Sequence, residues 1–572
     1  MLLKIGLIVA LLTTPAETPV ADAAEHNNVQ SVRYLLQHGE DVNAAQSDGL
    51  TALHWAALNN NLEVTEILLY AGGSVKSTTR VGGYTPLHLA SQSGYFEIMG
   101  AILEAGADPN QFTSTGITSM HFAAVSNVPE AIHVLAGYGG NINVLDNFAN
   151  RTPVMFASVK NANTSLGTLI DLGANLEMTT RIKNYVERAN GDNEDRVQRN
   201  RVKDAENGED APDSGLGGSF RPPPDPDSTK AEAPPIPVVT VLSGNEQIGN
   251  QGGLTALHLA AREGHIESAL RLVEGGADVN HVTEGDLSSP LLVAVINGNY
   301  DLAKMLLEHD ADPNLLSDDN AGPLFATLNI EWSLRTWYPQ PSMFRQQENT
   351  YLDLLKLLLD AGAEPDQRVS THIWYAAYNA GRMGVDFTGA TPFWRAAYAH
   401  DVNAMTILAD YGADPNIWTT KLPSRRPPDP DAIDPSGLEP IPDGGPGVHP
   451  IHAASGVGFG TSRVAQQHRG VPDGWLPAVK YLVEEHGIDP NLRDMGGYSS
   501  IHHAAARGDN ETILFLVRSG ADVELISRNG QTTADLANSP EQRAQPHPVT
   551  VALLEKLGSR NNHNCRSCGT GN

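Results

Sequence analysis

The chain has 572 residues, with 38 Lys or Arg against 67 Asp or Glu, and its formal net charge is −29. Such an acidic chain repels phosphate groups, which argues against a nucleic acid or an anionic membrane as its partner. No apolar run of about 20 residues is present, so we expect no membrane-spanning helix. The two cysteines both lie close to residue 572, so the rest of the chain is expected to fold without a disulfide.

Residues 1–16 have the pattern of a secretory signal peptide. Lys4 supplies a positive start, residues 5–12 form a short apolar run, and small residues follow. The alternative is an apolar first helix of the folded protein. Cleavage after residue 16 is favoured because it leaves Thr18 in phase with the repeats that follow. We therefore expect an exported protein, either periplasmic or secreted.

One unit recurs along the chain. The copy from Thr85 to Asn110 reads TPLHLASQSGYFEIMGAILEAGADPN, in which Thr-Pro favours a helix start and glycines end two short amphipathic helices. Further copies start at Thr51, Thr118 and Thr152, at intervals of 34, 33 and 34 residues (51 to 85, 85 to 118, 118 to 152). A helix pair of this size cannot bury its apolar face alone and needs a neighbour of the same kind.

The period and the T-P-L-H-x-A motif match the ankyrin repeat, and the chain resembles an ankyrin-repeat protein of about twelve repeats. The resemblance implies an all-α solenoid of stacked helix-turn-helix units with projecting turns. It also implies a non-catalytic scaffold that needs no cofactor and binds a protein partner through a concave surface. We expect such a scaffold to act as a monomer.

The repeats fall into two blocks. Residues 17–180 hold repeats one to five, residues 181–252 form a charged and Pro-rich linker or projecting loop, and residues 253–559 hold repeats six to twelve. The first part of the linker has the composition of a solvated helix. Because repeats five and six both have good helices, we favour one continuous stack with the linker looped out. Insertions interrupt the second block near 331–350, 367–390, 418–447 and 456–475, and 560–572 is a polar tail expected to be disordered.

Six histidines occupy the same motif position: His54, His88, His121, His258, His452 and His502. The resemblance implies that each imidazole bonds to backbone near the turns and joins adjacent repeats. Neighbouring repeats lie about 10 Å apart, too far to share a metal ion whose ligands must approach within about 2 Å. We therefore predict a structural role for these histidines and no metal site.

Two alternatives to a scaffold remain open. Cys565 and Cys568 form a C-x-x-C without the following His of a haem-attachment site, so a disulfide or an inert tail is favoured over a redox accessory. Gly456 to Gly460 lack the Lys-Ser/Thr ending and the preceding strand of a phosphate loop. An enzyme hidden in the insertions of repeats eight to ten would use polar residues such as His372, Tyr375, Arg382 and Asp386.

Aromatic residues concentrate around the insertions of repeats eight and nine, and five of the seven tryptophans lie between Trp332 and Trp418. Trp and Tyr dominate the residues that contribute most to binding in protein interfaces. We therefore predict a partner site there, made by Trp332, Arg335, Trp337, Tyr338, Trp374, Trp394 and Trp418. The alternative is that these rings fill extra core that the insertions create. The sequence does not identify the partner.

Overall fold

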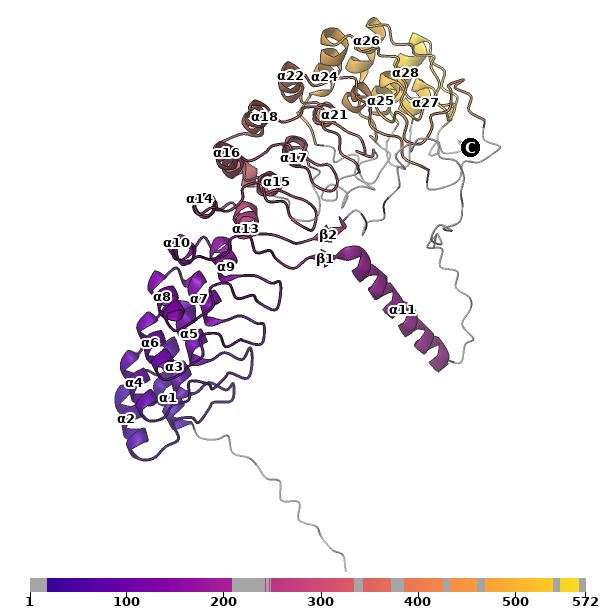
Figure 1. The fold of residues 1–572 in the computed structure, drawn as a ribbon. Coiled ribbons are helices and arrows are strands. Elements are labelled where there is room, and N and C mark those ends of the chain that lie inside the picture. The colour runs from indigo at the N-terminus through magenta and orange to yellow at the C-terminus, as the bar shows by residue number, and fades with distance from the viewer. Residues whose placement is uncertain are drawn as a thin grey trace, which may run out of the picture. The chain divides into compact units, whose positions relative to one another are not determined.

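The computed structural model describes residues 18–207, 242, 246, 248–333, 343–371, 385–424, 433–459, 469–538 and 546–564, with side chains omitted for 201–207. The chain forms two compact units. Unit 1 comprises Met1–Arg181 with Gly253–Val279, and unit 2 comprises Ile182–Gly252 with Asn280–Asn572. Each unit is built from antiparallel helix pairs in chain order (Figure 1). The fold is therefore the all-α repeat solenoid that the motif predicts.

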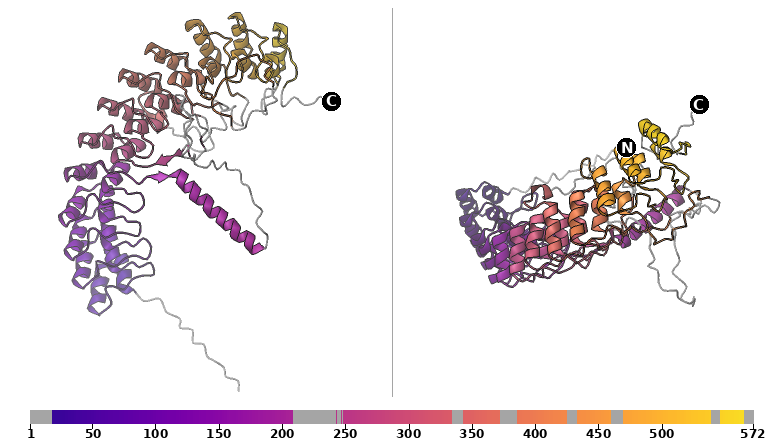
Figure 2. Two further views of the ribbon diagram at one scale, coloured as in Figure 1. Left: turned by 45° about the vertical axis from the view of Figure 1, so that its right-hand side comes forward. Right: turned by 90° about the horizontal axis from the view of Figure 1, so that it is seen from above.

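Unit 1 holds six helix pairs. They are α1 (Pro19–Glu25) with α2 (Val29–Gln37), α3 (Ala52–Leu58) with α4 (Leu62–Tyr70), α5 (Pro86–Ser93) with α6 (Phe96–Glu104), α7 (Ser119–Ser126) with α8 (Pro129–Gly137), α9 (Pro153–Val159) with α10 (Asn163–Asp171), and α13 (Ala256–Glu263) with α14 (Ile266–Glu274). The first helices of successive pairs pack on one another, and so do the second helices. Figures 1 and 2 show the resulting two rows, with the turns between repeats projecting beside the row of first helices.

The start of α5 shows why the motif makes a helix. Thr85 is extended, and its hydroxyl accepts a hydrogen bond from the backbone N–H of His88, which satisfies one of the unpaired N–H groups of the first turn. Pro86 follows at the first helical position, where no N–H is needed. Gly94 ends the helix with φ at 71°, a conformation that favours glycine.

The projecting turns, which we call fingers, comprise residues 43–50, 76–84, 110–117 and 143–151 in unit 1. Each finger is bonded to the next through its backbone. The N–H of Arg80 donates to the carbonyl of Asp48 at 2.8 Å, that of Ser114 to Gly82 at 2.9 Å, and that of Asn147 to Thr115 at 3.2 Å. The fingers therefore form one connected edge and hold their side chains in register with the helices beneath.

Repeat six packs directly on repeat five, because α13 contacts α9 and α14 contacts α10. The N–H of Thr180 donates to the carbonyl of Leu254 at 3.0 Å, and the N–H of Gly253 donates back to Thr180 at 3.1 Å. These two hydrogen bonds join the end of repeat five to the start of repeat six, across the inserted residues 182–252. The stack is thus continuous from repeat five to repeat six, and the compact units divide after Val279 rather than within the linker.

The inserted residues after Arg181 begin with a short strand and a long helix, and a second short strand ends them. Strand β1 (Lys183–Asn184) pairs antiparallel with β2 (Asn250–Gln251), with Lys183 opposite Gln251. Helix α11 (Tyr185–Asn207) follows β1, and the side chains described along it are exposed or half-buried. This is the solvated helix that its polar composition predicts.

Unit 2 continues the repeats with less regular pairs. They are α15 (Pro290–Ile296) with α16 (Tyr300–Glu308), α17 (Pro323–Glu331) with α18 (Tyr351–Asp360), α21 (Pro392–Tyr398) with α22 (Val402–Asp410), α23 (Pro450–Ala454) with α24 (Trp475–Lys480), α25 (Ser500–Ala506) with α26 (Asn510–Arg518), and α27 (Thr533–Ala537) with α28 (Pro548–Leu557). A 3₁₀ turn, η1 (Met343–Gln346), precedes α18, and a π-helical turn, η3 (Tyr481–Glu485), extends α24. None of the helices described is long and apolar enough to cross a membrane.

Candidate partner-binding surface

Four of the six motif histidines join one repeat to the next. In repeat three, Nδ1 of His88 accepts from the N–H of Thr85 at 3.0 Å, so the proton lies on Nε2, which donates to the carbonyl of Gln111 at 2.9 Å. Equivalent bonds run from His54 to the Tyr84 carbonyl at 3.0 Å, from His121 to Arg151 at 3.0 Å and from His452 to Leu492 at 2.8 Å. These rings therefore hold finger backbone against the first helices.

Burial keeps these imidazoles neutral. Loss of solvent lowers the pKa of His88 and of His452 to about 4 and that of His502 to about 3, and it also lowers the pKa of His54 and His121. Both nitrogens of His88 are already hydrogen-bonded, so neither serves as a metal ligand or a general base. Across the described ranges, no three His, Cys, Asp or Glu side chains are grouped so that they could hold a metal ion.

Other residues fill the histidine position in some repeats. Met155 accepts weakly from the N–H of Thr152 at 3.4 Å, and Asp535 accepts from the N–H of Thr532 at 3.0 Å. In α17 the motif reads Gly322-Pro323-Leu324-Phe325, so both the capping hydroxyl and the imidazole are missing. The capping group therefore varies between repeats while the helix start is kept.

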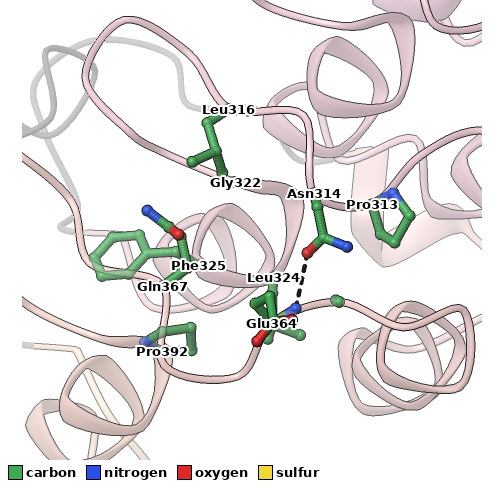
Figure 3. A pocket seen from close by; sticks show the side chains of 10 residues that line it. Pro313, Asn314, Leu316, Gly322, Leu324, Phe325, Glu364, Gln367 and Pro392 are labelled. Carbon is green, nitrogen blue, oxygen red and sulfur yellow. Dashed lines mark hydrogen bonds between the residues drawn. The ribbon is translucent and has the colours of Figure 1, made fainter.

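A small pocket lies where α17 lacks these side chains (Figure 3). Its lining includes Leu316 from the preceding finger, Gly322 and Phe325 at the start of α17, and Gln367 after α18. A Cβ atom added at Gly322 would lie 2.9 Å from the Leu316 side chain, which is too close, so a Thr at this position would require Leu316 to move. The pocket leaves room for about one water molecule and is too small for a substrate.

Trp394 is fully buried and belongs to the core rather than to a surface. Its indole N–H donates to the carbonyl of Val448 at 3.0 Å, and its ring stacks on Tyr398 with centroids 5.3 Å apart. Phe387, from the insertion before α21, packs edge-on against both rings. The prediction that Trp394 binds a partner is therefore wrong. The ring fills core, as the alternative proposed, and it has no exposed surface that a partner could contact.

Trp332 and Trp418 are half-buried at the edges of this core. The indole N–H of Trp332 donates to Asp401 Oδ2 at 3.0 Å, and the same oxygen accepts from the hydroxyl of Tyr351 at 2.7 Å. Trp418 lies edge-on to His449, with ring centroids 4.9 Å apart. Both rings are held by neighbours and expose only part of their surface.

The other residues predicted for sites fall mostly outside the described residues. This holds for Arg335, Trp337, Tyr338 and Trp374 of the predicted partner site, for His372, Tyr375 and Arg382 of the enzyme alternative, for Cys565 and Cys568, and for residues 1–16. Asp386 is described, and its carboxylate accepts from the N–H of Thr388 at 2.8 Å, which closes a local turn.

Unit 1 presents a surface that the sequence predictions passed over. Directly after the motif histidine, successive repeats carry Trp55, Leu89 and Phe122, and after Met155 the next repeat carries Phe156. The three aromatic residues are half-buried, and Leu89 between them is buried. Because these positions are one repeat apart on stacked first helices, they form a row, which we call the apolar stripe.

The fingers line the apolar stripe. Tyr84 of one finger contacts Phe122, with ring centroids 5.9 Å apart, and the guanidinium of Arg151 lies over Phe156 at 4.6 Å and over Phe148 at 5.6 Å. Three finger side chains are well exposed: Val81 at 83%, Phe148 at 65% and Phe112 at 48%. Aromatic rings held by their neighbours, with exposed apolar side chains beside them, are what a protein-binding face offers.

The stripe corresponds to the variable x of T-P-L-H-x-A, which is why it was missed. The constant letters of the motif turn inward and build the fold, so they say nothing about the surface. The helical period gives the signal that was available: x follows the buried histidine by one residue, about 100° around the helix, so it can face solvent. Aromatic or large apolar residues at x in four consecutive repeats would then indicate a surface rather than a core.

Comparison with known families agrees with this architecture. A family model for ankyrin repeats in three copies matches residues 20–113, 87–180 and 231–317, and a model for ankyrin repeats in many copies matches residues 467–517. These matches include repeats in both units. The chain belongs to the ankyrin-repeat proteins.

Several curated proteins share part of this array. A palmitoyltransferase, Hip14, of Drosophila melanogaster is 32% identical over 102 residues, which are 18% of this chain and 16% of that protein. The ankyrin repeat and SOCS box protein 3 of Homo sapiens is 39% identical over 94 residues, 16% of this chain and 18% of its own. A putative ankyrin repeat protein of Rickettsia bellii is 33% identical over 139 residues, 23% of this chain and 53% of its own.

The chain thus spans about a sixth to a quarter of the palmitoyltransferase relatives, and they match only through their ankyrin repeats. The similarity therefore supports the repeat architecture and a general role in protein–protein interaction.

Proposed function

We propose that this protein is a non-catalytic scaffold that binds a protein partner through the apolar stripe and the fingers beside it in unit 1. The observation that carries the proposal is the row of Trp55, Leu89, Phe122 and Phe156 next to the exposed finger residues Val81, Phe112 and Phe148. A soluble protein rarely exposes apolar side chains contiguously unless they bind something. The ankyrin-repeat family supports a protein as that partner.

The chemistry of the described residues supports binding rather than catalysis. Burial keeps the imidazole of His88 neutral, and both of its nitrogens bond within the fold. The pocket at Gly322 is too small for a substrate. The redox alternative depends on Cys565 and Cys568, and an absorbance spectrum with a thiol assay on the purified protein tests it directly.

The insertions of repeats eight and nine remain a second candidate surface. We keep this proposal for Arg335, Trp337, Tyr338 and Trp374, together with the exposed edges of Trp332 and Trp418. The supporting observation is that both described rings are half-exposed and fixed by neighbours, as Trp332 is by Asp401. Trp337→Ala would lower affinity with an unchanged melt if the ring contacts a partner, and would lower the melt alone if it fills core.

Export, a monomeric state and avoidance of nucleic acid complete the proposal. The pattern of residues 1–16 supports export to the periplasm or out of the cell. The net charge of −29 opposes binding to nucleic acid. Light scattering of the purified protein measures the oligomeric state.

The test begins with affinity capture on the mature protein and identification of the captured partner by mass spectrometry. Affinity for that partner is then measured with the double variant Phe112→Ala and Phe148→Ala, whose exposed rings can be removed with little effect on the melt. We expect a loss of about tenfold or more, because central aromatic contacts each contribute about 2 kcal/mol.

The matched control is Tyr70→Ala. Tyr70 is 96% exposed and lies on α4, in the row of second helices, away from the fingers. Its removal is expected to leave affinity unchanged. Equal affinities for wild type and for the Phe112 and Phe148 double variant would overturn the proposed surface.

A further inference from the structure

The apolar stripe ends in a pair of acids at repeat one. Asp22 stands at the position that Trp55 occupies in repeat two, and Glu25 stands at the position of Leu58. Both acidic side chains are exposed on α1, which packs against α3. The row of first helices therefore changes from apolar to anionic within one repeat.

The two carboxylates are held in place by a finger. Nε2 of Gln46 donates to Asp22 Oδ1 at 2.8 Å and to Glu25 Oε2 at 2.9 Å. The Oε1 atom of Gln46 accepts from the indole N–H of Trp55 at 2.8 Å, so the amide bridges the acid pair to the first ring of the stripe. In the ranges that the structure describes, neither carboxylate forms an ion pair with a cation.

The opposite end of the stripe has no such excess of charge. In repeat six the stripe position is Leu259, which is buried, and Arg262 follows at the position equivalent to Glu25. Arg262 forms an ion pair with Glu263 at 2.9 Å, so this end is close to neutral. The two ends of the surface therefore differ in charge. Repeat one is anionic, repeats two to five are apolar, and repeat six is nearly neutral.

The spacing of the stripe selects a partner conformation. Packed helices lie about 10 Å apart, and seven residues of an α-helix rise about 10 Å. Side chains seven apart on a helix also share one face. An extended strand covers the same distance in about three residues, which places successive side chains on opposite faces. A helix lying along the stripe therefore meets every repeat with the same face.

We propose that the stripe binds an amphipathic helix of a partner protein, with apolar residues seven apart over Trp55, Leu89, Phe122 and Phe156 and with Lys or Arg over Asp22 and Glu25. This inference rests on the proposed function and adds the chemistry and orientation of the partner. The acid pair sets the orientation of the helix. A Lys or Arg of the partner is attracted most strongly to the end of the stripe where two carboxylates have no cation beside them. The aromatic rings supply the apolar contact.

The test uses synthetic helical peptides of about 30 residues, long enough to cover five repeats at seven residues each. The peptides are labelled with a fluorophore and titrated with the full-length protein by anisotropy. One peptide carries four Leu residues spaced by seven and three Lys at one end. A second has three Glu in place of the Lys, and a third has the same composition with the Leu spacing scrambled. We expect the first to bind at least about tenfold more tightly than either other peptide.

The protein variants separate the acid pair from general charge. Asp22→Asn with Glu25→Gln keeps the hydrogen-bonding groups and removes both charges. We expect it to weaken the Lys peptide about tenfold and to flatten the salt dependence of its affinity. The matched control is Glu97→Gln with Glu104→Gln, which removes two exposed charges from α6 in the row of second helices. This control should bind like wild type.

The outcomes are distinct. Equal binding of the Lys peptide to wild type and to the Asp22 and Glu25 variant would overturn the inference, and so would equal binding of the scrambled peptide or no binding of the Lys peptide. The proposed function would survive any of these results if the captured partner still requires Phe112 and Phe148. It would fall separately if that partner is indifferent to them.

Discussion

Replacing His88 by Met gives a sharp test of how the motif histidines stabilise the array. Met already occupies the equivalent position in repeat five, where Met155 is buried beside Thr152, so the substitution is compatible with the fold. In repeat three it removes the hydrogen bond from Nε2 to the Gln111 carbonyl and leaves that partly buried acceptor without this partner. We expect a cost of about 1–3 kcal/mol at pH 7.

The same substitution removes a source of acid sensitivity. Burial lowers the pKa of His88 from 6.5 to about 4, so the unfolded chain takes up a proton at a higher pH than the folded chain. The contribution of the neutral His88 ring to the free energy of unfolding is complete above pH 6.5 and is lost as the pH falls towards 4. At pH 5 the unfolded imidazole is mostly protonated and the folded one is mostly neutral, which costs the wild type about 2 kcal/mol relative to pH 7. A methionine at this position carries no such loss.

The assay is native-state hydrogen exchange followed by mass spectrometry, with protection factors for peptides from α5 at pH 7 and pH 5. We expect wild type to exceed the His88→Met variant in stability at pH 7 and the difference to shrink by about 2 kcal/mol at pH 5. A difference that is the same at both pH values would refute the reasoning, because it would mean that His88 titrates alike in the folded and unfolded chains. Peptides from α8, which holds none of the motif histidines, provide the internal control.

Three further results are expected. Trp394→Ala should lower the free energy of unfolding by about 3–5 kcal/mol in urea melts, because it leaves a cavity beside Tyr398; an unchanged melt would contradict the buried position. Limited proteolysis should cut first within residues 182–252, since long polar segments outside the repeats are preferred sites, and a first cut inside α5 or α6 would count against this. N-terminal sequencing from the native host should begin after residue 16, and recovery of Met1 would exclude processing of the leader.

The repeat architecture was predictable because each helix start is coded locally. Thr85, Pro86 and Gly94 determine where α5 begins and ends through a cap, a fixed φ and a left-handed turn, and none of these depends on distant residues. The polar composition of residues 185–207 likewise predicted a solvated helix, which is α11. Local chemistry repeated at a fixed period leaves few alternatives to a stacked solenoid.

The aromatic residues were harder to place because burial is a property of the packed array. Trp394 and Trp418 both lie in the Trp-rich region, yet Trp394 is covered by Tyr398 and Phe387 while Trp418 keeps part of its surface. Composition marks such a region as unusual without telling a core from an interface. The packing of insertion residues such as Phe387 against α21 decides between them.

The sequence by itself determined the repeat, its helix pairs and the capping motif, since all of these follow from short-range patterns. It favoured a continuous stack of repeats five and six, and the contacts of Thr180 with Gly253 and Leu254 across the insertion decided it. Only the tertiary structure decided which apolar side chains face solvent. The apolar stripe exists because stacking places the x positions of successive repeats in one row. The carboxylates of Asp22 and Glu25 are held together at its end because Gln46 bonds to both from a finger. Both depend on contacts between residues separated by a finger or a whole repeat, which no local pattern records.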